Sequence, residues 1–417
     1  MSPPETEHRT SLPPELWLQV FELASVIPDE LDPDIHDPFV DPSSDTIFTI
    51  INPRTSAPAF RSAVSARRSL VCVCKTWRVL ATPLLYRTLF FDNAAQITEL
   101  ADTLAVRDLG VHVRRLELVA TSGAVDFNDL RFLLSCLGNL QILHICPLHY
   151  VTNVIPSDLL YALADAAAGS LAMLIWPSWP GLLCKRTDHE QLLRACTRLR
   201  TLVLGPWRMD DACTFATPAL PSLRFTALAE HVAEHAKPAV RFPALAHVFL
   251  AYSRMPDLDC TASFLALHGS GLTAAYVNVS GYHRDAAGAL SALRACPRLA
   301  HVVLFVTVPS LHDGKLGACE HLPHVTHVGI HGIQIRRPQA ELPHLLRVLA
   351  RAMESFPETV KVLRVMNDLR GIEVRNALVE CRDAAQRHGI ELQGLRGEVF
   401  VSPNVADTGS LAERSYV

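Results

Sequence analysis

A pair of cysteines one residue apart, Cys72 and Cys74, stands in the apolar stretch "LVCVCKTWRVL" at residues 70–80. Two thiolates can hold a metal ion or exchange electrons as a disulfide pair. On a helix, however, these positions point about 200° apart, and no second Cys or His pair follows at the spacing of a zinc finger. We therefore expect neither a metal nor a redox centre here, but two buried thiols that pack as small apolar side chains.

A second candidate for metal chemistry is the stretch "CEHLPHVTHVGIH" at residues 319–331. Its possible ligands are Cys319, His321, His324, His327 and His331. Residues 325–330 have the pattern of a strand, in which side chains three positions apart point to opposite faces. The chain also has 19 histidines, so that chance clusters are common. We expect no metal site here.

The rest of the sequence has none of the short motifs that mark common catalytic centres. It contains no GxxxxGK(S/T) loop for phosphates, no GxGxxG turn for dinucleotides and no GxSxG nucleophile elbow. We expect no catalytic residue and no cofactor. A hydrolase with dispersed active-site residues stays open as a distant alternative.

The composition is that of a globular protein with a large core. Of the 417 residues, 49% are apolar and 19% are charged, with a net charge of −4. This charge gives no reason to expect nucleic acid or an anionic membrane as a partner, and the Arg-Arg pairs at 67–68 and 336–337 are expected on solvated faces. No signal peptide, membrane span or disulfide framework is apparent, which favours a cytosolic or nuclear protein.

Two apolar helices are predicted to position the cysteine pair. The first lies in "SLPPELWLQVFELAS" at residues 11–25, whose prolines suit the first turn of a helix. Its apolar stripe consists of Leu16, Val20 and Leu23, with Trp17 and Phe21 beside them. The second stripe consists of Leu70, Val73, Trp77, Leu80 and Leu84, and Pro83 is expected to end or kink that helix. Stripes this wide on short helices need a core or a partner.

Together, "LPPELWLQVFELA" and "SLVCVCKTWRVLATPLLYRTL" resemble the F-box, particularly the divergent fungal type. The shared features are a Leu-Pro opening, a carboxylate, an apolar helix, and a Cys-Lys-x-Trp run with an apolar tail. The resemblance implies three small helices that dock on a Skp-type adaptor and, through it, on the cullin scaffold of an SCF ubiquitin ligase. The adaptor-binding residues that it implies are Leu12, Pro13, Leu16, Trp17, Val20, Phe21, Leu70, Val73, Cys74, Trp77 and Leu80.

The chain departs from the F-box pattern between the two helices, where residues 27–66 are inserted. This insert has six prolines and seven acidic residues against Arg54 and Arg61, which predicts an acidic, extended and disordered loop that is dispensable for folding. Such a loop need not prevent the two halves from packing. A plain helical hairpin that caps the next domain remains the alternative to an F-box.

From residue 110 onward, a strand-like pattern of apolar-x-x-apolar-x-apolar recurs every 22 to 35 residues, often after a helical segment. Its copies are "VRRLEL" (113), "LQILHI" (140), "LAMLIW" (171), "LRTLVL" (199), "LRFTAL" (223), "LAHVFL" (245), "LTAAYVNV" (272), "LAHVVL" (299), "VTHVGI" (325) and "VKVLRV" (360). The pattern resembles an irregular leucine-rich repeat that lacks the usual Asn or Cys ladder. An ordinary α/β sheet domain is the alternative.

The predicted fold class is therefore α/β: a small all-helical F-box-like region followed by an irregular leucine-rich-repeat-like α/β solenoid. The expected divisions are a disordered 1–10, an F-box-like 11–92, a solenoid over 93–402 and a flexible tail at 403–417. This arrangement is typical of a substrate-recognition subunit of an SCF-type ligase. The alternative from another class is an interaction scaffold whose helical head recruits no ligase.

The target protein is predicted to bind the exposed face of the repeat strands, although a β surface covered by loops is the alternative. In each copy the fourth and sixth residues are expected inside, so that the third and fifth point outward. This outward set includes Arg115, Glu117, His144, Met173, Thr201, His247, Phe249, His301, Val303, His327 and Arg364. The candidate target-binding residues among them are Met173, His247, Phe249, His301 and His327.

Overall fold

The computed structural model divides the chain into two compact units, which are described one at a time. The first unit comprises Met1–Asp34 and Thr46–Ala212, and the second comprises Ile35–Asp45 and Cys213–Val417. The residues that the structure describes are 12–27, 29–42, 47, 57–93, 95–122, 124–145, 149–150, 155–176, 185–204, 220–228, 242–251, 258–279, 286–307, 322–333, 338–367, 369 and 372–400. The expected disordered N-terminus and flexible C-terminal tail lie outside the described residues.

The first unit opens with a three-helix head, made of α1 (Pro14–Ala24), α3 (Ala57–Val73) and α4 (Lys75–Arg87). The stripe predicted as one helix is broken at Cys74, whose backbone is extended (φ −157°, ψ 173°). The Cys74 sulfur accepts the N–H of Trp77 at 3.4 Å and so caps α4. The expectation that Cys72 and Cys74 are buried is wrong, because both thiols are exposed at this helix junction.

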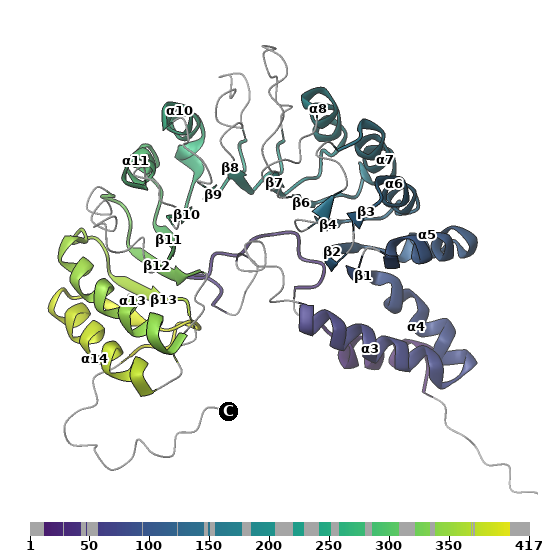
Figure 1. Ribbon diagram of the computed structural model, residues 1–417, viewed down its shortest axis with the longest axis horizontal. Helices are drawn as coiled ribbons and strands as arrows, with labels where there is room; N and C mark the ends of the chain where they lie inside the picture. Colours follow the sequence, from purple (N-terminus) through teal and green to yellow (C-terminus); the bar gives the residue numbers. More distant parts are fainter. Residues whose placement is uncertain are drawn as a thin grey trace, which may run out of the picture. The chain divides into compact units, whose positions relative to one another are not determined.

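The head is followed by parallel strands that pair in chain order. The strands of this sheet in the first unit are β1 (Thr88–Asn93), β2 (Arg115–Ser122), β4 (Ile142–Ile145), β6 (Met173–Trp176) and β7 (Thr201–Leu204). The helices between them are α5 (Ala95–Arg107), α6 (Phe127–Ser135), α7 (Ser157–Ala167) and α8 (Arg186–Ala195), with a short η2 (Leu109–His112). A separate pair is formed by β3 (Ala124–Val125) and β5 (His149–Tyr150). In Figure 1 these helices lie on one side of the strands.

The second unit repeats this architecture with seven strands in the described part of the chain. They are β8 (Phe225–Leu228), β9 (His247–Ala251), β10 (Ala274–Asn278), β11 (His301–Val306), β12 (His327–Gly332), β13 (Val362–Val365) and β14 (Glu391–Gln393). The helical segments are α10 (Leu258–His268), η3 (Gly269–Gly271), α11 (Ala286–Ala292), η4 (Leu293–Ala295), α13 (Pro338–Ala352), η6 (Met353–Ser355) and α14 (Ile372–Arg387). The core lies between the strands and these helices.

All ten predicted strands are present, and the predicted fold class, an irregular leucine-rich-repeat-like α/β solenoid after a small helical region, is confirmed. The fourth and sixth residues of the first copy, Leu116 and Leu118, are fully buried, as the pattern predicts. Four described strands were not predicted: β1 and β14 in the main sheet, and the separate pair β3 and β5. Because β1 pairs with β2, the strand region begins at Thr88 rather than at residue 93.

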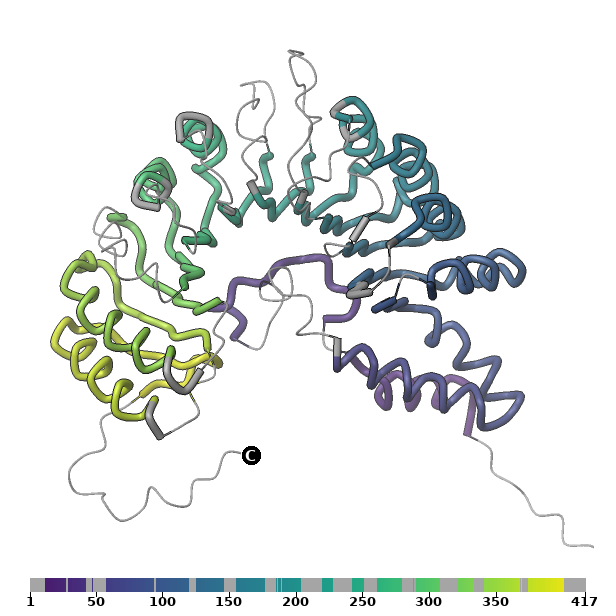
Figure 2. Tube along the Cα trace, viewed as in Figure 1, coloured from purple at the N-terminus to yellow at the C-terminus, as the bar shows by residue number. Residues whose placement is uncertain are grey.

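The prediction of a disordered insert over residues 27–66 is wrong where the structure describes it. Residues 57–66 belong to α3, and residues 29–42, here called the inner segment, pack against the strands. In Figure 2 the part up to Asp34 lies beside the strands of the first unit and the part from Ile35 lies beside those of the second, in each case on the side away from the helices. Composition suggested disorder, but order here depends on specific partners, and Ile35 and Asp37 are both buried. Residues 43–46 and 48–56 lie outside the described residues.

Candidate protein-binding surfaces

The head has a small aromatic core of its own. The fully buried Phe21 packs against Trp17 and Trp77, with ring centroids 5.8 Å and 4.7 Å away, and the two Trp rings are 4.7 Å apart. Leu70 and Leu80 are partly buried against the same cluster. Five of the predicted adaptor-binding residues therefore hold the head together. Trp77, one of the predicted adaptor-binding residues, is partly buried in this cluster.

The outward side of α1 carries an apolar stripe, here called the outer stripe. It consists of Leu16, Val20 and Leu23, which recur every three or four residues on one helix face, and of Leu12, which lies two residues before the helix. They keep 43%, 45%, 77% and 45% of their surface exposed. Three of the four belong to the predicted adaptor-binding set. A contiguous apolar stripe on the surface is typical of a helix that docks on another protein.

The other predicted adaptor-binding residues, Pro13, Val73 and Cys74, are also exposed. Pro13 precedes the first turn of α1, whereas Val73 ends α3 and Cys74 caps α4. The structure therefore sorts the predicted set into an inner group that builds the head and an outer group that is accessible. The sequence could not separate these groups, since both are apolar at helical spacing.

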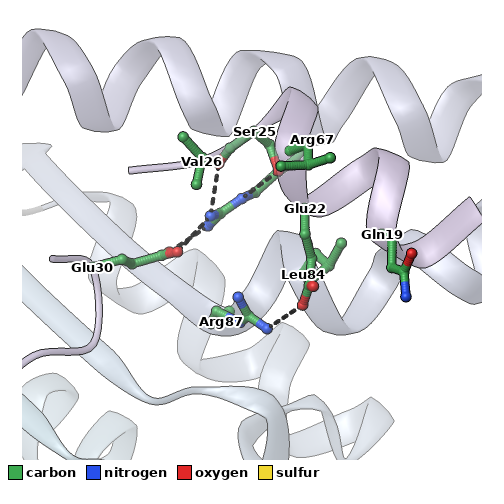
Figure 3. A pocket seen from close by; sticks show the side chains of 9 residues that line it. Gln19, Glu22, Ser25, Val26, Glu30, Arg67, Leu84 and Arg87 are labelled. Atoms are coloured by element: carbon green, nitrogen blue, oxygen red, sulfur yellow. Dashed lines mark hydrogen bonds and ion pairs between the residues drawn. The ribbon is translucent and has the colours of Figure 1, made fainter. Parts of the chain in front are cut away.

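A pocket of about 450 Å³ lies where α1, α3 and α4 meet the start of the inner segment (Figure 3). Arg67 is fully buried beside it and donates to both carboxylate oxygens of Glu30, at 2.7 Å and 2.8 Å, and to the Ser25 carbonyl at 3.1 Å. Arg87 pairs with Glu22 at 2.9 Å. The expectation that Arg67 lies on a solvated face is wrong, because it anchors the inner segment to α3.

In the first unit, the inner segment contacts the strand ends through its backbone and its acidic side chains. Arg115 donates to the Glu30 carbonyl at 2.8 Å, and the Thr201 hydroxyl donates to the Pro33 carbonyl at 2.7 Å. Arg200 forms an ion pair with Asp34. Two of the acidic residues that suggested disorder, Glu30 and Asp34, are thus matched by cations elsewhere in the chain.

Beneath this contact lies a buried carboxylate on the outward-predicted face, Glu117. It accepts from Arg115 at 2.8 Å, and its other oxygen lies 3.1 Å from a ring nitrogen of His144. Burial raises the pKa of Glu117, but the charges and hydrogen bonds of Arg115 and His144 lower it by more. The pKa of Glu117 therefore falls to about 2. Glu117 is therefore ionised at neutral pH and holds a charge cluster inside the protein.

In the second unit, the inner segment lies across the column of histidines that the sequence places on one face. His247 Nδ1 lies 3.0 Å from the Ile35 carbonyl, which accepts from it. His301 pairs with the carboxylate of Asp37. His301 and His327 occupy directly paired positions of β11 and β12, and their rings are 4.6 Å apart.

The side chain of Phe39 occupies an aromatic and cationic cage in the same unit. Its ring centroid lies 5.2 Å from each of the His301 and His327 rings, and the Arg364 guanidinium lies over it at 4.9 Å. Arg364 also donates to the Pro38 carbonyl. Burial and the neighbouring His301 lower the pKa of His327, so that its neutral ring is favoured for packing.

The five predicted target-binding residues do not form an open face. Met173 and Phe249 are buried, and His247, His301 and His327 are half-buried and contact the inner segment or each other. The prediction of an exposed strand face is therefore wrong for these residues in the described structure, because the chain itself covers the histidines. The sequence offered one signal for this contact: the insert has acidic residues between prolines, and the strands have a column of histidines that could pair with them.

The described residues offer little for metal or thiol chemistry. No group of three His, Cys, Asp or Glu side chains among them is placed to hold a metal ion. Cys319 and His321 lie outside the described residues. Burial raises the pKa of Cys196, Cys296 and Cys381 to about 12, which keeps these thiols protonated. Among the described helices, none combines the length and apolar character that crossing a membrane would require.

Two solved structures are similar to this chain at a low level. The leucine-rich repeat-containing protein LegL7 of Legionella pneumophila is 14% identical, with a TM-score of 0.39, and the match covers 75% of this chain and 92% of that one. A chain of the yeast Rad7 and Elc1 complex is 13% identical, with a TM-score of 0.30, and the match covers 84% of this chain and 98% of that one. Neither a protein-family model nor a curated protein matches the sequence. The function has to be argued from the residues of this chain.

Proposed function

We propose that this protein is a substrate-recognition subunit of an SCF-type ubiquitin ligase, whose head docks on a Skp-type adaptor and whose strand region binds a target protein. The outer stripe of α1 carries the proposal. The aromatic residues of the three-helix head pack in its own core. Leu12, Leu16, Val20 and Leu23 nevertheless remain accessible. An apolar stripe of this kind is stabilised by a partner helix or groove.

In this proposal the protein performs no chemistry itself. The adaptor and cullin would place the bound target near a recruited ubiquitin-conjugating enzyme, and tethering raises the effective concentration of the target's amino groups. The rival proposal is a protein-interaction scaffold that recruits no ligase. The two differ in one measurable property, the affinity of the outer stripe for a Skp-type adaptor.

The test is isothermal titration of the full-length chain with a purified fungal Skp-type adaptor. Replacing one anchor at a protein interface commonly costs about 2 kcal/mol or more, which corresponds to about a 30-fold loss of affinity. We expect at least this loss for Leu16→Glu and for Val20→Glu, with unchanged thermal unfolding because both side chains are already accessible. The matched control is Val379→Glu on α14, where the valine is 44% exposed, close to the 45% of Val20.

The control variant should bind the adaptor as the wild type does. A wild-type chain that ignores the adaptor would reject the ligase proposal and leave the scaffold. Equal losses in Val20→Glu and Val379→Glu would show that the outer stripe is not the docking surface.

A further inference from the structure

The strands of the second unit present a row of polar and aromatic side chains with the character of a peptide-binding site. His247, Tyr276, His301, His327 and Arg364 come from five successive strands, β9 to β13. The parallel register places His301 beside His327, and Tyr276 beside Phe249 and Val303. An extended chain that crosses these strands meets each side chain in turn.

Residues Ile35–Phe39 show which chemistry this row recognises. Two of its members bind backbone carbonyls: His247 contacts that of Ile35, and Arg364 contacts that of Pro38. The carboxylate of Asp37 is matched by His301. The next recognition element is an aromatic ring two residues later, which the cage of two imidazoles and a guanidinium accepts.

The inner segment behaves as an occupant of this row more than as a strand of the sheet. It forms no β-ladder with the described strands, and its own backbone bonds are local, such as those from Val40 N and Asp41 N to the Asp37 carbonyl at 2.9 Å. Val40 is 76% exposed although it directly follows the caged Phe39. Residues 35–39 are held by the buried Ile35 and Asp37, the caged Phe39 and two bound carbonyls, and a segment that offers the same groups can replace them.

One buried donor in the row is left unused by the inner segment. The Tyr276 hydroxyl is fully buried and has no hydrogen-bond partner among the described residues. Burial and the nearby Asp37 raise the pKa of Tyr276 well above its ordinary value, so that the hydroxyl stays protonated. An unsatisfied buried donor costs free energy, and a ligand with an acceptor at this position would bind more favourably.

We infer that the strand face of the second unit is a binding site for an extended acidic peptide with an Asp-x-aromatic sequence, and that Ile35–Val40 occupies it as an internal competitor. A tethered competitor acts at an effective concentration in the millimolar range and lowers the apparent affinity of the free peptide accordingly. This peptide class would be the target of the proposed ligase subunit. Only the word target rests on the proposed function; the binding site itself does not.

The test measures fluorescence anisotropy of a labelled peptide with the chain's own residues 35–41, IHDPFVD, against full-length protein without any adaptor. The variant Asp37→Ala/Phe39→Ala removes the competitor's two side-chain contacts and should bind the peptide at least tenfold more tightly than the wild type does. His301→Ala in that background should abolish the gain. Val40→Ala is the matched control within the same segment and should behave as the wild type.

A second measurement uses the unaltered protein. Saturating peptide should speed amide hydrogen exchange at residues 35–40, whereas a peptide with Asn at the position of Asp37 and Ala at that of Phe39 should not. Equal peptide affinity in the folded double variant and the wild type would overturn the inference. Loss of cooperative unfolding in the double variant would also overturn it, because residues 35–40 would then be part of the fold. Since no adaptor is present, neither outcome bears on the ligase proposal.

Discussion

The outer stripe of α1 and the strand face of the second unit are two surfaces that need a partner, and they meet that need differently. The outer stripe is aliphatic and stays accessible, with Val20 45% exposed. The strand face is aromatic and charged, and the chain's own Asp37 and Phe39 fill it. In our proposals the first surface binds the adaptor, whereas the second stays covered until a competing segment displaces residues 35–40.

The reason for the difference lies in the cost of exposure. A short aliphatic stripe on one helix can stay exposed at modest cost, and it keeps its full affinity for an apolar groove. A row of imidazole, guanidinium and phenol groups would instead hold water and bind many anions weakly. Covering it with a segment of the same chain gives selectivity, because only a ligand that matches both Asp37 and Phe39 competes well.

The largest expected effect breaks the anchor of the inner segment. Removing one partner of a buried ion pair typically costs about 3–5 kcal/mol, because the other charge stays buried without compensation. Arg67→Met should lower the free energy of unfolding by that amount, measured by urea denaturation. The same substitution at Arg61, also on α3 but in an exposed pair with Asp92, should cost less than about 1 kcal/mol. Similar losses in both variants would contradict the anchoring role of Arg67.

The next effect separates the inside of the head from its outer stripe. Phe21→Ala removes the buried centre of the aromatic cluster and should cost about 3 kcal/mol or more. Leu16→Ala, on the same helix but accessible, should change the free energy of unfolding by less than about 0.5 kcal/mol. Urea denaturation of both variants tests this ordering. A large loss for Leu16→Ala would mean that the outer stripe is covered within the chain.

The smallest effect depends on pH and concerns the charge cluster under the inner segment. The folded pKa of Glu117, about 2, is below its ordinary 4.5, so its stabilising contribution is present above pH 4.5 and is lost as the pH falls toward 2. At about 1.4 kcal/mol per pKa unit, this contribution is at most about 3 kcal/mol. Glu117→Gln should therefore be less stable than the wild type at pH 7, and the difference should shrink between pH 4.5 and 2. A constant difference across this range would exclude the titration of Glu117 as its cause.

The strands and the outer stripe could be predicted from the sequence, because both follow from apolar residues that recur at short, regular spacing. Leu116 and Leu118 are buried for the reason that the pattern gave, namely that alternate residues of a strand face the same side. The break at Cys74 was missed, since a cysteine that caps a helix has the same apolar surroundings as one inside it. β14 has three residues, too few for a pattern, whereas the six residues of β1 were missed because they directly follow the apolar end of α4.

The sequence by itself determined the parallel strands, the helices between them and the two apolar stripes of the head, because each follows from residues a few positions apart. Only the tertiary structure decided that Arg67 is buried, that the acidic insert is ordered over residues 29–42, and that the histidine column is covered. Asp37 and His301 are 264 positions apart. Composition averages over such residues, whereas the free energy of ordering a segment depends on the few distant partners that it meets.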